Sequence, residues 1–174
     1  MNTKGVQIGV LGPGNCTADE CGAAETIGRI IAEENGIVCC GGLGGVMEAA
    51  CRGARSKGGL TVGIVPDTGD GNAYLDIVIR SGLGHARNVV LVQTADAVVA
   101  IGGAYGTLSE LAIALKSGRA VFGYRSYDIP GVIACDTPGE AAVRALDAAR
   151  RFRSGRTPRV FQEQPGTRLT GQPP

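Results

Sequence analysis

Three glycines, a threonine and a glutamate follow an apolar run near the middle of the chain, in a spacing suited to binding an anion. Residues 97–101 are predicted to form a buried strand, and a helix is expected to begin at Thr107. Backbone N–H groups at a helix start are unpaired and carry partial positive charge, so such a turn favours phosphate. Glycine lets a ligand approach the backbone closely. We predict that residues 102–107 hold a phosphorylated small molecule and that Glu110 faces it.

Glu110 has a second explanation that requires no ligand. The run Thr107-Leu108-Ser109-Glu110 has the spacing of a capping box, in which Thr107 accepts from the backbone of Glu110 and the carboxylate returns a bond. Such a cap contributes about 1 kcal/mol to helix stability. Spacing alone does not distinguish a cap from a ligand contact.

Arg87 lies near the start of another predicted helix, where a cation opposes the helix dipole. A phosphate or carboxylate partner would account for it, and so would an ordinary solvated arginine. The neighbouring His85 is the single histidine of the chain and a candidate general base. A lone histidine is more often a packed or surface residue.

Two further glycine loops follow predicted strands. Residues 12–15 follow the strand 6–11, and residues 41–45 follow the strand 37–40 and precede a helix. Any tight turn from a strand to a helix uses glycine, so one loop alone says little. Three loops at the carboxyl ends of parallel strands would meet at one sheet edge, where such sheets bind ligands. Their convergence predicts a binding site.

Strands alternate with helices along the chain, which predicts an α/β fold with a Rossmann-like, doubly wound, mostly parallel sheet. The expected strands are 6–11, 37–40, 60–65, 76–79, 97–101, 120–124 and 131–135, and the expected helices are 18–35, 46–56, 84–94, 107–116 and 138–152. One domain is expected over residues 1–152. Residues 153–174 mix arginine with proline and are expected to form a basic, disordered tail.

Composition limits the function. Net charge is +1, which argues against a nucleic-acid partner held by a broad basic face. The six cysteines include no C-x-x-C pair, so we expect no metal site, and reduced thiols packed as small apolar residues. There is no signal-peptide pattern and no apolar run near the ~18 residues of a membrane span. We expect a cytoplasmic protein without a membrane partner, and NAD and P-loop fingerprints are absent.

The pattern Gly-Gly-x-x-Gly-Thr-x-x-Glu, with Arg87 placed 23 residues before Glu110, resembles the LONELY GUY ("lysine decarboxylase-like") family of the SLOG superfamily. The resemblance implies a phosphoribohydrolase that releases a free base and ribose 5-phosphate from nucleoside 5′-monophosphates. It places Arg87 and Glu110 on that family's catalytic pair. The chain departs from it at Gly102-Gly103-Ala104, where the family has Pro-Gly-Gly, and at Asn88, where the family has lysine.

Residues 41–50 and 86–88 are more similar to a branch that contains molybdenum-cofactor carrier proteins. This resemblance implies a carrier of a phosphorylated, nucleotide-like ligand, with molybdenum cofactor as one cargo, and a homo-oligomer, either a dimer or a tetramer. We take the carrier as the first hypothesis and the phosphoribohydrolase as the alternative. The candidate catalytic residues are Arg87 and Glu110, and the candidate ligand-binding residues are Gly12, Gly14, Asn15, Gly41, Gly42, Gly44, Gly45, Met47, Gly102, Gly103, Ala104, Tyr105, Gly106 and Thr107.

Overall fold

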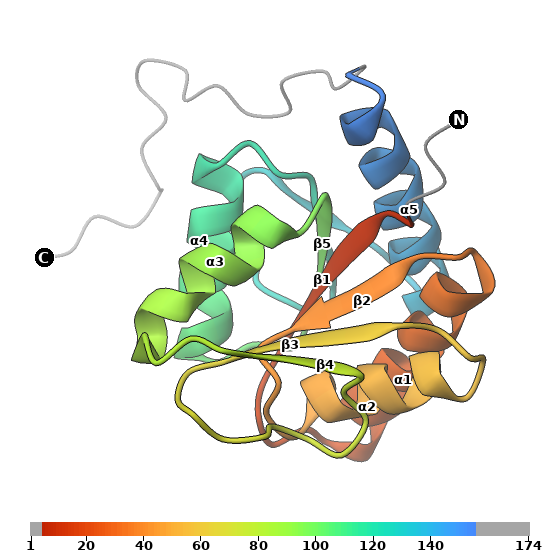
Figure 1. Ribbon diagram of the computed structural model, residues 1–174. Coiled ribbons are helices and arrows are strands. Elements are labelled where there is room, and N and C mark those ends of the chain that lie inside the picture. The colour runs from red at the N-terminus through yellow and green to blue at the C-terminus, as the bar shows by residue number, and fades with distance from the viewer. Residues whose placement is uncertain (1–4, 156–174) are drawn as a thin grey trace, which may run out of the picture.

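A computed structural model describes residues 5–155 as one seven-stranded sheet with helices on both faces (Figure 1). The strands are β1 (Gln7–Leu11), β2 (Ile37–Cys40), β3 (Thr61–Val65), β4 (Ile77–Arg80), β5 (Ala97–Ile101), β6 (Val121–Tyr124) and β7 (Val132–Ala134). The helices are α1 (Ala18–Glu33), α2 (Val46–Arg55), α3 (Arg87–Thr94), α4 (Tyr105–Lys116) and α5 (Pro138–Arg153), with a 3₁₀ turn η1 (Gly84–Ala86) before α3. No helix among these residues has the length and apolar character to cross a membrane.

The strand order is β4-β3-β2-β1-β5-β6-β7, and every neighbouring pair is parallel. β1 pairs with β2 on one side, with Ile8 opposite Val38, and with β5 on the other, with Val10 opposite Val99. The winding direction reverses between β1 and β5, which places the topological switch point of the sheet there. The predicted Rossmann-like fold is confirmed, and the sheet is parallel throughout.

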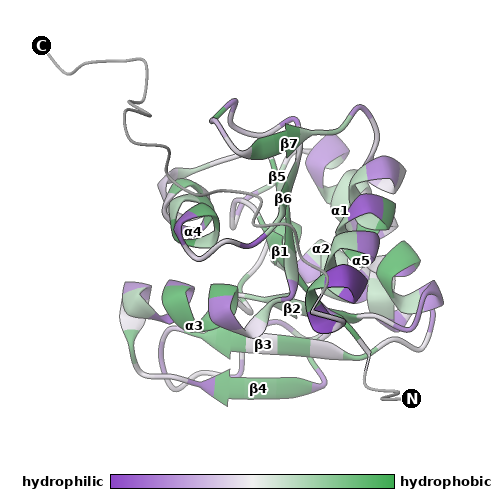
Figure 2. Cartoon of the chain, turned by 90° about the horizontal axis from the view of Figure 1, so that it is seen from above, coloured by the Kyte–Doolittle hydropathy of each residue, from purple (hydrophilic) through white to green (hydrophobic). Residues whose placement is uncertain are grey.

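Helices α1, α2 and α5 cover one face of the sheet, and α3 and α4 cover the other (Figures 1 and 2). β5 shows how the sequence produces this arrangement, because all five of its residues are buried. Ala97, Val99 and Ile101 point into the core under α1, α2 and α5. Val98 and Ala100 point into the core under α3 and α4. A strand covered on both faces needs a continuous apolar run, not an alternating one.

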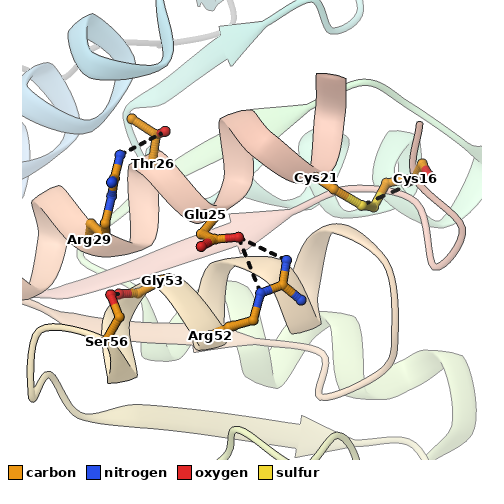
Figure 3. A network of polar contacts seen from close by, with 8 residues as sticks. All are labelled: Cys16, Cys21, Glu25, Thr26, Arg29, Arg52, Gly53 and Ser56. Carbon is orange, nitrogen blue, oxygen red and sulfur yellow. Dashed lines mark hydrogen bonds and ion pairs between the residues drawn. A yellow bond between two sulfur atoms is a disulfide. The ribbon is translucent and has the colours of Figure 1, made fainter. Parts of the chain in front are cut away.

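The helices α1 and α2 pack at very short range because each has a glycine at their contact. Figure 3 shows the two helices side by side, with Gly53 of α2 labelled. A Cβ on Gly28 would overlap the carbonyl oxygen of Ala50, and a Cβ on Gly53 would overlap that of Glu25. Beside this contact, Arg52 donates two hydrogen bonds to Glu25, at 2.9 and 3.2 Å. The pair of glycines therefore sets the distance at which α2 and its preceding loop lie from the rest of the domain.

A disulfide joins Cys16 to Cys21 at the start of α1, which corrects the expectation that all six thiols are reduced (Figure 3). Their Cα atoms lie 5.7 Å apart, within the range that a disulfide spans. The reason is the helix start, since Thr17 caps α1 and Glu20 completes its capping box, folding the chain back between the two cysteines. The other four cysteines, Cys39, Cys40, Cys51 and Cys135, are free and buried, as expected.

The last helix extends one residue beyond the domain boundary expected at residue 152. Arg153 ends α5, and its Nε donates to the carboxylate of Asp96 at 2.8 Å. Asp96 is buried and also accepts from the backbone N–H of Gln7 at 2.7 Å. This carboxylate therefore ties the start of β1 to the end of α5. The remainder of the expected tail, residues 156–174, lies outside the described residues.

Candidate functional site

A cavity of about 250 Å³ opens at the carboxyl edge of the sheet, beside the switch point between β1 and β5. Its walls come from the segments that follow β1, β2 and β3 and from the first turns of α3 and α4. The lining residues are Gly12, Pro13, Gly14, Leu43, Met47, Pro66, Gly84, His85, Arg87, Asn88, Ala104, Gly106, Thr107 and Glu110. The cavity thus lies where doubly wound sheets bind their ligands.

The first turn of α4 forms one wall of the cavity, and no side chain caps it. The helix begins at Tyr105, two residues earlier than expected, because the backbone is already helical there and Ala104 is the extended N-cap residue. Of the two explanations left open for Glu110, the capping box is therefore excluded, since Thr107 lies inside the helix and not at its N-cap. Its hydroxyl is buried and has no hydrogen-bond partner among residues 5–155. An uncapped helix start with a free hydroxyl is suited to an anionic ligand.

Arg87 and Glu110 form a buried ion pair at the cavity wall. The distance from Arg87 Nη1 to Glu110 Oε1 is 3.0 Å, and the two residues are only 8% and 5% exposed. Gly41 makes room for the pair, because a Cβ there would overlap the Arg87 guanidinium. Gly41 itself does not line the cavity, so it positions Arg87 from behind. The pair places one cation and one carboxylate beside the uncapped turn.

Burial raises the pKa of Glu110 to about 7, although the positive charge and hydrogen bond of Arg87 act in the opposite direction. Burial favours the neutral carboxyl because the charged form loses its hydration. Glu110 is therefore partly protonated near neutral pH, which lets one carboxyl group act either as an acceptor or as a donor.

The raised pKa of Glu110 predicts a pH-dependent stability. The folded protein keeps this proton up to about pH 7, whereas the unfolded chain releases it near 4.5, so the contribution of Glu110 to the stability of the folded state is greatest below pH 4.5. The contribution, about 3 kcal/mol in full, is lost as pH rises through this interval. Urea unfolding between pH 4.5 and 8 should show this decline in the free energy of unfolding relative to Glu110→Gln. Equal pH dependence in both proteins would contradict it.

Asn88 joins the first turns of α3 and α4. Its Nδ2 donates to Ser109 Oγ at 2.8 Å, and that hydroxyl donates to the carbonyl oxygen of Gly106 at 2.9 Å. Asn88 is buried and lines the cavity. Where the LONELY GUY pattern has lysine, this chain therefore has a neutral side chain, which is hydrogen-bonded to the first turn of α4.

Eight of the predicted site residues line the cavity, namely Gly12, Gly14, Met47, Arg87, Ala104, Gly106, Thr107 and Glu110. The others, Asn15, Gly41, Gly42, Gly44, Gly45, Gly102, Gly103 and Tyr105, do not. Several of these glycines serve the backbone or its packing. Gly45 has a φ of 62° where α2 begins, and a Cβ on Gly103 would overlap Tyr127.

The lining residues that were not among the candidates are Pro13, Leu43, Pro66, Gly84 and Asn88, and His85, the candidate general base, also lines the cavity. His85 and Asn88 were visible in the sequence beside Arg87, and Pro13 and Leu43 lie within the predicted glycine loops. Only the sheet order brings Pro66, at the end of β3, to the same wall.

The fold and the cavity define a doubly wound α/β protein with a small-molecule cavity at its switch point. The chain belongs to the SLOG cluster4 family, whose profile matches residues 5–149. An uncharacterized protein of Archaeoglobus fulgidus is 47% identical over 140 residues, covering 79% of this chain and 93% of that protein.

Two solved structures with this fold are described as molybdenum cofactor proteins. The molybdenum cofactor binding protein of Rippkaea orientalis is 34% identical, with a TM-score of 0.78 over 84% of this chain and 98% of that one. The molybdenum cofactor carrier protein of Chlamydomonas reinhardtii is 33% identical, with a TM-score of 0.75 over 82% and 99%. These neighbours support a ligand-binding, carrier type of protein, in agreement with the resemblance found in the sequence.

Proposed function

We propose that this chain binds and carries a phosphorylated, nucleotide-like small molecule in the cavity at its switch point. The observation that carries the proposal is the Thr107 hydroxyl, which is buried in the uncapped first turn of α4 and has no partner in the part of the chain that the structure describes. Buried polar groups in folded proteins are nearly always hydrogen-bonded. A bound phosphate supplies acceptors both for this hydroxyl and for the free backbone N–H groups beside it.

The other walls of the cavity suit the remainder of such a ligand. Pro13, Leu43, Met47 and Pro66 line it with apolar groups against which a flat ring can pack. The volume of about 250 Å³ is just below the range of typical ligand cavities, roughly 300–1,000 Å³. A mononucleotide or a phosphorylated pterin is therefore a better match than a dinucleotide. Since the relatives are named for molybdenum cofactor, we propose a pterin of that type as the cargo.

Thr107 provides the test of this proposal. Thr107→Val keeps the shape of the side chain and removes the hydroxyl, so we expect about a tenfold loss of affinity for AMP and for inorganic phosphate. Thr107→Ser restores the hydroxyl and should bind as the natural protein does. Isothermal titration calorimetry measures both variants. The proposal fails if the natural protein binds neither probe, or if the valine and serine variants bind equally well.

The buried pair of Arg87 and Glu110 favours a second candidate, a nucleoside 5′-monophosphate phosphoribohydrolase. Cleavage of an N-glycosidic bond builds positive charge on the ribose, which a nearby carboxylate stabilises while it orients water. Glu110 Oε2 has no partner among residues 5–155, and Glu110 lines the cavity. Incubation with AMP, followed by chromatography for free adenine, separates the candidates. Release that disappears in Glu110→Gln establishes the enzyme, and bound but intact AMP supports the carrier.

A further inference from the structure

Two of the free, buried cysteines lie in contact behind the second glycine loop, residues 41–45. Cys40 is the last residue of β2, Cys51 lies in α2, and their Sγ atoms are 3.5 Å apart. Both residues are 0% exposed. A disulfide has an S–S bond of about 2.05 Å, so the two sulfur atoms need to approach by only about 1.5 Å. The fold therefore brings together two thiols that a small movement can join.

The surroundings of Cys40 favour its thiolate, which is the reactive form of cysteine. The backbone N–H of Gly42 donates to Cys40 Sγ at 3.3 Å. The hydrogen bond from the Cys51 thiol lowers the pKa of Cys40 against the effect of burial, and the Gly42 N–H and the positive charge of Arg87 act in the same direction. The hydrogen bond to Cys40 and burial raise the pKa of Cys51. Cys40 is therefore the better nucleophile of the pair.

Cys39 precedes Cys40 in β2 but lies in a different environment. Successive residues of a strand point to opposite faces of the sheet. Cys40 packs in the core under α1, α2 and α5, and Cys39 packs in the core under α3 and α4. Burial raises the pKa of Cys39 to about 12, so it stays a thiol. Cys39 therefore provides a matched comparison for Cys40, with the same type of residue at the same depth.

We propose that Cys40 and Cys51 are a site of reversible oxidation, at which a peroxide converts the two thiols into a second disulfide. With hydrogen peroxide, the Cys40 thiolate attacks one oxygen, the O–O bond breaks, and Cys40 becomes a sulfenic acid while the other oxygen leaves as water. The sulfur of Cys51 then attacks the sulfur of Cys40, the S–S bond forms, and the second oxygen leaves as water with the proton of Cys51. The two thiols together lose two electrons and two protons, which reduce one peroxide to two waters.

Both sulfur atoms are buried, so a peroxide reaches them when the second glycine loop opens. Leu43, at the centre of the loop, is 41% exposed. The loop is held from outside by Asn72, whose backbone N–H donates to the carbonyl oxygen of Gly42 at 2.8 Å and whose Nδ2 donates to that of Leu43 at 3.0 Å. Local opening of a loop costs less free energy than global unfolding. Hydrogen peroxide is close to water in size, so a brief opening admits it to the folded protein.

The new bond closes a ring around the second glycine loop and the start of α2. The residues between Cys40 and Cys51 include Met47, which lines the cavity. Cys40 is followed by Gly41, whose backbone lies directly against the Arg87 guanidinium. A shift of Cys40 toward Cys51 therefore displaces two parts of the cavity wall. We expect the oxidised protein to bind AMP about tenfold more weakly, the effect of one lost hydrogen bond to Arg87. This consequence rests on the proposed function, whereas formation of the disulfide does not.

Peptide mapping of the full chain tests the oxidation site. The folded protein is treated with hydrogen peroxide, the remaining thiols are blocked with N-ethylmaleimide, and digestion with trypsin and a glutamate-specific protease cuts after Glu48, between Cys40 and Cys51. We expect a disulfide-linked pair of peptides that dithiothreitol separates. Cys39→Ala is expected to keep this pair and Cys40→Ala to lack it. The proposal is overturned if the treated natural protein lacks the linked pair, if Cys39→Ala abolishes it, or if it persists in Cys40→Ala.

Calorimetric titration with AMP tests the effect on the cavity. The peroxide-treated natural protein is expected to bind about tenfold more weakly than the untreated protein, and peroxide-treated Cys40→Ala to bind as it does before treatment. This control excludes oxidation of Met47 as the cause, because Met47 is present in both proteins. Equal affinities of the treated and untreated natural protein overturn the effect on the cavity. Absence of AMP binding in the untreated protein counts against the proposed function alone, since the linked peptides are detected without a ligand.

Discussion

Arg87→Met is expected to reduce the affinity for AMP and inorganic phosphate roughly 100-fold, the cost of losing a buried, charge-assisted contact. Arg87 lines the cavity beside the uncapped turn of α4 and is its one arginine or lysine. Methionine keeps the length of the side chain and removes its donors. Calorimetric titration of both probes against the variant and the natural protein measures the loss.

The same variant has a second expected result, which separates an electrostatic role from a general defect. Arg87 lowers the pKa of Glu110, so its removal moves that pKa above 7. The pH interval over which stability declines is then expected to extend upward. Arg151→Met, on the exposed side of α5, is the control and should change neither property. Unchanged phosphate affinity in Arg87→Met would refute the role of this arginine in binding.

Gly53→Ala is expected to destabilise the domain by about 3 kcal/mol, the upper range for overpacking in a core. A methyl group there would overlap the carbonyl of Glu25, and backbone atoms cannot move aside as a flexible side chain does. The helices must separate, and α2 carries Met47 away from the cavity. Chemical denaturation measures the change in the free energy of unfolding.

Gly22→Ala is the matched control for this change. Gly22 lies in α1, and a Cβ there meets nothing within 4 Å. The same substitution is therefore expected to be neutral or to stabilise by about 0.5–1 kcal/mol, because alanine favours a helix. Equal effects of the two substitutions would show that close approach of α1 and α2 is not what Gly53 provides.

The positions of the strands and the class of the sheet could be predicted because a strand that is buried on both faces is a continuous apolar run, which is visible in the sequence. The bounds of β2 and β5 match the expectation residue for residue, since each is a short apolar run between turn residues. The start of α4 could not be predicted, because Thr107 and Glu110 have the spacing of a cap while the backbone begins its helix at Tyr105. Local spacing competes there with a tertiary contact, the pair of Glu110 with Arg87.

The roles of some glycines near the site could likewise be predicted from the sequence, whereas the roles of others depend on contacts made only in the fold. Gly12 and Gly14 line the cavity, as loop position alone suggested. Gly41 resembles them in the sequence, but its role depends on a side chain from α3 that reaches it only in the folded chain. The disulfide between Cys16 and Cys21 could not be predicted from the sequence either, because it depends on the path of the chain around the cap at Thr17.

A carrier must release its ligand as well as bind it. The contact of Gly41 with Arg87 would affect both steps in the proposed carrier. The guanidinium lies directly against the backbone at the start of the second glycine loop, with no space between them. A displacement of that loop therefore pushes on the cation, and a displacement of the cation pushes on the loop. For the proposed ligand, the contacts to its anionic end and the contacts to its ring are therefore coupled, so that a change on one side of the cavity is transmitted to the other.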